Sequence, residues 1–147
     1  MKEELLKRVK EKVQLRINEA RKAIEAAQSA ANEETKSSAG DKYETGRAMA
    51  QNDRDMYARQ LIEAERDMAV LEGINPEVVT KKIGVGSLVE SSMGWMWLAT
   101  SVGQVKMENR NIMVLSPESP IGAAVLGLEI GDKTDFRGNT IKILGIS

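Results

Sequence analysis

Two carboxylates three residues apart, Asp41 and Glu44, are the residues of this chain whose types and spacing best suit chemistry. A pair of carboxylates suits Mg²⁺, which commonly takes one or two protein carboxylates and fills its octahedron with water and phosphate oxygens. Two acids alone have no walls that could exclude water or position a substrate. We therefore expect the pair to complete a site that belongs to another molecule.

The composition excludes catalytic chemistry that depends on cysteine or histidine. The 147 residues include no cysteine and no histidine, which excludes disulfides, thiolate nucleophiles, imidazole bases and Ser-His-Asp triads. Acid–base or metal chemistry would have to come from Asp, Glu, Lys or Tyr. The net charge of -1 gives no global basic field, so any contact with DNA or RNA must be local or made through a partner.

The acid pair lies between two stretches with helical periodicity. No glycine or proline occurs from Glu3 to about Lys36, and apolar residues recur there at intervals of three and four, as in a coiled-coil seam. This first seam comprises Leu6, Val9, Val13, Ile17, Ala20, Ile24, Ala27 and Ala31. A second seam, within residues 47–72, comprises Ala50, Arg54, Tyr57, Leu61, Ala64, Met68 and Leu71.

The segment from Ser37 to Gly46, with two glycines and two serines, favours a turn between these helices. We therefore predict an antiparallel coiled-coil hairpin of roughly 50 Å, from ~1.5 Å of rise per residue, with its acidic tip at residues 37–46. A parallel homodimer of kinked helices is the alternative. Gly73 and Pro76 are typical of a helix stop, so we expect the hairpin domain to span residues 1–76.

In residues 77–147, short apolar runs separated by glycines and polar turn residues predict short strands. The expected strands are 86–90, 95–100, 104–107, 111–115, 133–136 and 140–146, with a hairpin turn at Arg137-Gly138-Asn139. Ser119 suits an N-cap and Pro120 a first helical position, and residues 121–126 give one or two apolar turns, which predicts one short helix. The expected fold class is α+β: a helical hairpin followed by a small antiparallel sheet domain with one short helix.

Three further observations bear on partners and location. The first twelve residues are charged throughout and lack the apolar core of a signal peptide, and no apolar run approaches the ~18 residues of a membrane span. We therefore expect a soluble cytoplasmic protein without a membrane partner. Trp95 and Trp97 lie two apart on one face of a strand; sheet packing is the favoured interpretation, and an exposed contact for a partner is the alternative.

Two motifs make the chain resemble a known family. The segment Gly40-Asp41-Lys42-Tyr43-Glu44 fits a glycine-aspartate-two residues-glutamate pattern, and residues 119–132 run from Ser119-Pro120-Ile121 to Gly131-Asp132. Together they resemble the tip motif and the C-terminal signature of the Gre family of bacterial transcript-cleavage elongation factors. The resemblance implies a Gre-type coiled coil followed by an FKBP-like domain over residues 77–147.

The resemblance also implies a mechanism. In that family the hairpin enters the secondary channel of bacterial RNA polymerase, and the tip acids help to hold the second Mg²⁺ and a water. Asp41 and Glu44 would therefore stimulate the polymerase's own cleavage of backtracked RNA near the nascent 3′ end. The chain itself would be a monomer, would not be an enzyme and would have no cofactor of its own, because the Mg²⁺ is held jointly with the polymerase.

Other residues receive roles from the same resemblance. Lys42 or Arg47 could steady RNA phosphates; solvated surface charge is the alternative. The turn of Glu118, Ser119, Pro120 and Ile121 would dock on the polymerase near the channel mouth; a capped helix start with no further role is the alternative.

The sequence departs from the family pattern directly after the acidic motif. Thr45-Gly46-Arg47-Ala48 stands where the family usually has asparagine-alanine-glutamate-tyrosine. This leaves open a Gre-like regulator that occupies the channel and inhibits or modulates transcription without stimulating cleavage. A hairpin that pairs with some other helical partner is a third hypothesis.

Overall fold

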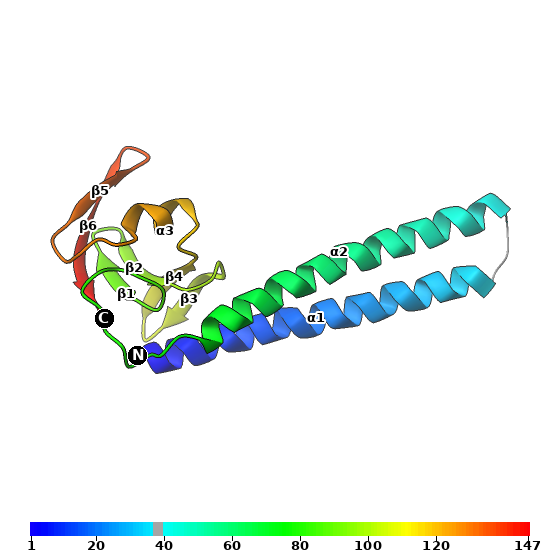
Figure 1. The fold of residues 1–147 in the computed structure, drawn as a ribbon, viewed down its shortest axis with the longest axis horizontal. Helices are drawn as coiled ribbons and strands as arrows, with labels where there is room; N and C mark the ends of the chain where they lie inside the picture. Colours follow the sequence, from blue (N-terminus) through cyan, green and yellow to red (C-terminus); the bar gives the residue numbers. More distant parts are fainter. Residues whose placement is uncertain (37–39) are drawn as a thin grey trace. The chain divides into compact units, whose positions relative to one another are not determined.

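The computed structural model describes residues 1–36 and 40–147, with side chains described except those of residues 34–44. Helices α1 (Lys2–Lys36) and α2 (Gly40–Glu72) come first (Figure 1). They are followed by β1 (Leu88–Ser91), β2 (Gly94–Leu98), β3 (Gly103–Met107), β4 (Arg110–Leu115), α3 (Pro120–Val125), β5 (Lys133–Phe136) and β6 (Asn139–Ile146). The α+β fold class is therefore confirmed.

The chain divides into two compact units. We call Lys12–Met68 the hairpin unit, and Met1–Glu11 together with Ala69–Ser147 the sheet unit. The ends of both long helices thus belong to the same unit as the strands. In the described part of the chain, no helix combines the length and the apolar character that crossing a membrane requires.

The hairpin unit consists of two antiparallel helices. Arg16 Nη1 lies 3.0 Å from Asp67 Oδ2, and Arg21 Nη2 lies 3.7 Å from Glu65 Oε1. Because the α2 partner number falls as the α1 number rises, the two helices run in opposite directions along one another (Figure 1). The predicted intramolecular hairpin is confirmed.

The predicted seams are largely the buried faces of the helices. Buried members are Leu6, Val9, Val13, Ile17, Ala20, Ala27, Ala31, Ala50, Ala64 and Leu71, whereas Ile24, Tyr57, Leu61 and Met68 are half-buried. Arg54 is exposed and pairs with the neighbouring Asp55 at 3.7 Å. Its assignment to the seam was wrong, because a long charged side chain keeps its head in water. Leu5 is fully buried and was missed.

The second helix begins earlier than predicted. Helix α2 starts at Gly40, so residues 40–46 are helical and do not belong to a turn. An acidic residue such as Asp41 is favourable in the first turn of a helix, where it complements the partial positive charge of the backbone amides. Gly46 costs only about 1 kcal/mol relative to alanine within a helix. Residues 37–39 lie outside the described residues.

The strands form one six-stranded sheet in the order β3-β4-β2-β1-β6-β5. Each predicted strand is present within two residues at its ends. Four of the five pairings are antiparallel, and β2 pairs with β4 in parallel, with Met96 opposite Met113. The sheet is therefore mostly antiparallel, as predicted, and the parallel β2–β4 pair is the one pairing that the prediction did not include. Alternation of apolar residues indicates a strand but does not determine the direction of its neighbour.

Both the predicted turn and the predicted short helix are confirmed. Arg137 and Gly138 join β5 to β6 with φ values of 49° and 82°, as a two-residue type I′ turn requires. Helix α3 begins at Pro120 with Ser119 as its N-cap. Its buried Val125 packs in one core with strand residues from both halves of the sheet, namely Val89, Met96, Leu98, Leu115, Ile141 and Ile143.

Candidate functional site

The candidate acidic site lies at the beginning of α2. Asp41, Lys42 and Glu44 belong to the first turns of this helix. Their side chains lie outside the described residues, so their roles stay predictions. Arg47 is exposed on the same helix.

The described residues include no group of three or more Asp, Glu, His or Cys side chains that could hold a metal ion. The donor set at residues 41 and 44 comprises two carboxylates, which are ligands that Mg²⁺ accepts. Two carboxylates are fewer than the six ligands of an octahedral ion. The remaining ligands would therefore come from water or from a second molecule.

The candidate docking turn at Glu118, Ser119, Pro120 and Ile121 is a tightly bonded structure. Ser119 Oγ donates to the Ser116 carbonyl at 2.6 Å and accepts from the Gly122 amide at 3.2 Å. The Glu118 amide donates to Ser116 Oγ at 3.0 Å, and the Ser119 amide to the Ser116 carbonyl, also at 3.0 Å. One serine therefore anchors the turn and a second one caps the helix, which holds residues 118–121 in one conformation.

Gly122 makes this arrangement possible. A Cβ at this position would lie 2.0 Å from the Ser116 carbonyl oxygen and 2.8 Å from Ser119 Oγ. Both distances are far below van der Waals contact, and the nearer atom belongs to the backbone. Only glycine therefore allows the first turn of α3 to close on Ser116.

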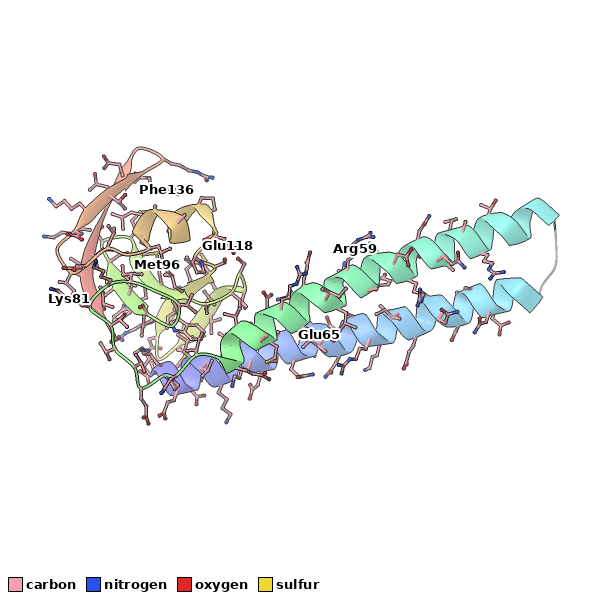
Figure 2. The ribbon with its side chains drawn as sticks, viewed as in Figure 1. Arg59, Glu65, Lys81, Met96, Glu118 and Phe136 are labelled. Atoms are coloured by element: carbon pink, nitrogen blue, oxygen red, sulfur yellow. The ribbon has the colours of Figure 1, made fainter. Side chains whose placement is uncertain are left out.

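A methionine-lined groove borders the docking turn, and the sequence did not predict it. Its volume is about 370 Å³, and its walls include Ile121 of α3 with Met93, Met96 and Met113 of the sheet region. Figure 2 labels Met96, which lines this groove, and Glu118, which belongs to the docking turn. Methionine side chains are flexible and polarizable, so they adapt to varied apolar partners. The available signal was the placement of methionines on neighbouring strands, but the parallel β2–β4 pairing that joins them was not foreseeable.

The two tryptophans have different environments. Trp97 is fully buried, and its Nε1–H donates to the Gly86 carbonyl at 3.1 Å. Trp95 is half-buried, with the Arg110 guanidinium 4.7 Å from its ring centroid. The packing interpretation therefore holds for Trp97.

These features define an α+β protein with an antiparallel helical hairpin and a six-stranded sheet that carries one capped helix. No family model matches the chain, and no curated protein matches it. The chain is similar to the crystal structure of GreA factor homolog 1 (Gfh1) of Thermus thermophilus, with 20% identity over 94% of each chain and a TM-score of 0.39. A second solved structure, of the transcription factor Gfh1, has 19% identity over 93% of this chain and 92% of the other, with a TM-score of 0.37.

Proposed function

We propose that this protein is a Gre-like transcription factor that binds bacterial RNA polymerase through its secondary channel and stimulates cleavage of backtracked RNA. The observation that carries the proposal is the glycine-aspartate-two residues-glutamate motif at the start of α2 in a long antiparallel hairpin. The C-terminal signature of residues 119–132, which begins at the Ser119 cap, supports it. The protein would activate the polymerase and would not be an enzyme by itself.

Asp41 and Glu44 would act on the polymerase's reaction. Positions three residues apart in an α-helix lie on one side of it, which suits joint action of the two carboxylates. They would hold Mg²⁺ together with polymerase groups, and the ion would supply a more acidic water and charge stabilisation at the phosphate. Lys42 and Arg47 would contact RNA phosphates.

The turn of residues 118–121 would dock on the polymerase. A turn held by four hydrogen bonds loses little conformational freedom on binding, because it is already ordered in the unbound protein. Ile121 lines the adjacent methionine-lined groove. We therefore infer that Glu118 and Pro120 contact the polymerase surface while the groove receives an apolar side chain of the polymerase.

The decisive experiment uses a stalled, backtracked elongation complex with Mg²⁺ and the purified protein. The parent should accelerate RNA cleavage, and Asp41→Asn combined with Glu44→Gln should abolish that acceleration. Polymerase binding should remain nearly unchanged, because the docking turn is intact. A matched control, Asp53→Asn with Glu63→Gln, removes two negative charges elsewhere on α2 and should cleave like the parent.

Each other outcome would contradict a different part of the proposal. If the parent binds polymerase, slows transcription and leaves backtracked RNA uncut, the protein is a channel-occupying regulator. If it does not bind polymerase, the hairpin serves another partner. If the double variant cleaves as well as the parent, the proposed role of Asp41 and Glu44 is wrong.

A further inference from the structure

A second cavity in the sheet unit shares Trp95 with the methionine-lined groove and is otherwise lined by different residues. Its volume is about 460 Å³, and Lys2, Glu3, Leu88, Trp95 and Arg110 contribute to its walls. This volume lies within the range of small-molecule sites, ~300–1,000 Å³. All of these residues belong to one compact unit, so the fold of that unit alone determines the cavity.

Two cations of this cavity have no carboxylate partner. Lys2 is 9% exposed, and its Nζ donates to the Val78 carbonyl at 2.7 Å. Arg110 Nη1 lies 3.7 Å from Met1 Sδ, which is a weak acceptor. Within the described residues, neither side chain takes part in an ion pair. Buried charges are normally paired, so a cavity with a buried, unpaired ammonium and a guanidinium suits an anion.

The desolvation of Lys2 points the same way. Burial lowers the pKa of the Lys2 ammonium below its ordinary value of 10.5. An anion in the cavity would counter this effect by stabilising the charged form. Glu3 also lines the cavity but is exposed, and it forms no ion pair with either cation within the described part of the chain. Met1 and Ser147 also line the cavity and carry the terminal ammonium and carboxylate groups. The three cationic groups outnumber the two anionic ones by one, which favours a ligand of low negative charge.

The aromatic wall adds a second requirement. Trp95 is half-buried, and the Arg110 guanidinium lies over its ring at 4.7 Å. Planar rings stack well on indole and guanidinium surfaces. The cavity therefore offers a flat surface beside two cations.

We propose that this cavity binds a small ligand that joins an oxyanion to a planar ring, the chemistry of a nucleoside monophosphate. The oxyanion contacts Lys2 and Arg110, and the ring stacks on the Arg110 guanidinium, which lies over the Trp95 ring.

The test uses the full chain and adenosine monophosphate as the probe, with calorimetry and tryptophan fluorescence as readouts. Trp95 and Trp97 are the two tryptophans of the chain, and Trp97 is fully buried, so quenching reports on Trp95. Arg110→Gln should weaken binding by about tenfold or more, since it removes a charge-assisted contact. Arg110 is exposed, so this variant should fold normally.

Controls separate the parts of the proposal. Arg137→Gln removes a comparable arginine, 5.0 Å from the Phe136 ring and outside the cavity, and should bind like the parent. Inorganic phosphate alone and adenosine alone should each bind more weakly than the monophosphate. Absence of saturable binding at millimolar probe, or equal affinity of Arg110→Gln and the parent, would overturn the proposal. Equal affinity for phosphate or for adenosine would also overturn it.

Discussion

Gly122 is the residue on which the candidate docking turn most depends. Gly122→Ala would place a Cβ 2.0 Å from the Ser116 carbonyl oxygen, so the backbone must move. We expect the free energy of unfolding to fall by about 2 kcal/mol, as for overpacked sites, and polymerase affinity to fall with it. Urea unfolding measures the first effect and a pull-down with polymerase the second.

A matched glycine provides the control for that prediction. A Cβ at Gly84 meets nothing within 4 Å, so Gly84→Ala should be nearly neutral for both stability and binding. Equal stability of the Gly122→Ala and Gly84→Ala variants would contradict the steric argument.

The sequence predicted the Ser119 cap and the position of Pro120 because cap preferences are local. It did not predict the need for Gly122, because the constraint comes from a carbonyl six residues earlier.

Lys2 should make stability rise with pH in the alkaline range. Burial lowers the pKa of this ammonium below 10.5, so the folded protein releases the proton at a lower pH than the unfolded chain does. Between these two pKa values the unfolded state binds more protons, and the free energy of unfolding therefore increases with pH. Below that window the proton is bound in both states, and this contribution does not change with pH.

Lys2→Met isolates this contribution. Unfolding of the parent and the variant is compared from neutral pH to about pH 10.5, so that the titration of all other groups cancels in the difference. We expect the parent to gain stability relative to Lys2→Met as the pH rises. A flat difference would mean that the pKa of Lys2 is the same in the folded and unfolded states, and a falling difference that folding raises it; either result would contradict the prediction. The burial of Lys2 could not be predicted from sequence, because it depends on packing beside Val78, 76 residues away.

At the scale of elements, periodicity predicted most boundaries because each element buries one face. The seams of α1 and α2 and the six strands follow from apolar spacing. The start of α2 at Gly40 was missed because glycine and serine were taken to favour a turn, whereas the helix tolerates Gly46. The β2–β4 pairing was missed because β3 and β4 form an antiparallel pair that returns β4 beside β2, and no local pattern encodes that order.

The stability of the hairpin unit should depend on the side chains of its seam and not on those of its outer faces. Ile17 is 4% exposed, whereas Leu15, two residues earlier, is 58% exposed. Ile17→Ala should lower the free energy of unfolding by about 2–5 kcal/mol, because it removes buried methyl groups and leaves a cavity. Leu15→Ala should change it by less than about 0.5 kcal/mol. Thermal unfolding followed by circular dichroism checks both predictions. Similar losses of stability in the two variants would contradict the assignment of Ile17 to the buried seam.

At the scale of the whole molecule, the sheet unit is discontinuous in sequence. A hairpin domain over residues 1–76 and a second domain over 77–147 stay predictions. In the structure, residues 1–11 and 69–76 belong to the same compact unit as the strands. Lys2 Nζ of α1 donates to the Val78 carbonyl at 2.7 Å, and Arg8 Nη1 of α1 donates to the Lys106 carbonyl at 2.9 Å. Arg8 thereby caps a carbonyl of β3, which is an edge strand of the sheet.

Two shortened chains decide which division holds. The first comprises residues 77–147 alone, and the second joins residues 1–11 to 69–147 through a short glycine-serine linker. The first lacks Leu5, Val9 and Leu71, each fully buried. Burial of such side chains contributes about 1.5–3 kcal/mol each, so their loss approaches a typical total stability of ~5–15 kcal/mol. We therefore expect the joined chain to unfold cooperatively with Trp97 protected from quenching, and the 77–147 fragment to be largely unfolded. Equal unfolding midpoints for the two chains would show that the sheet is stable without the helix ends.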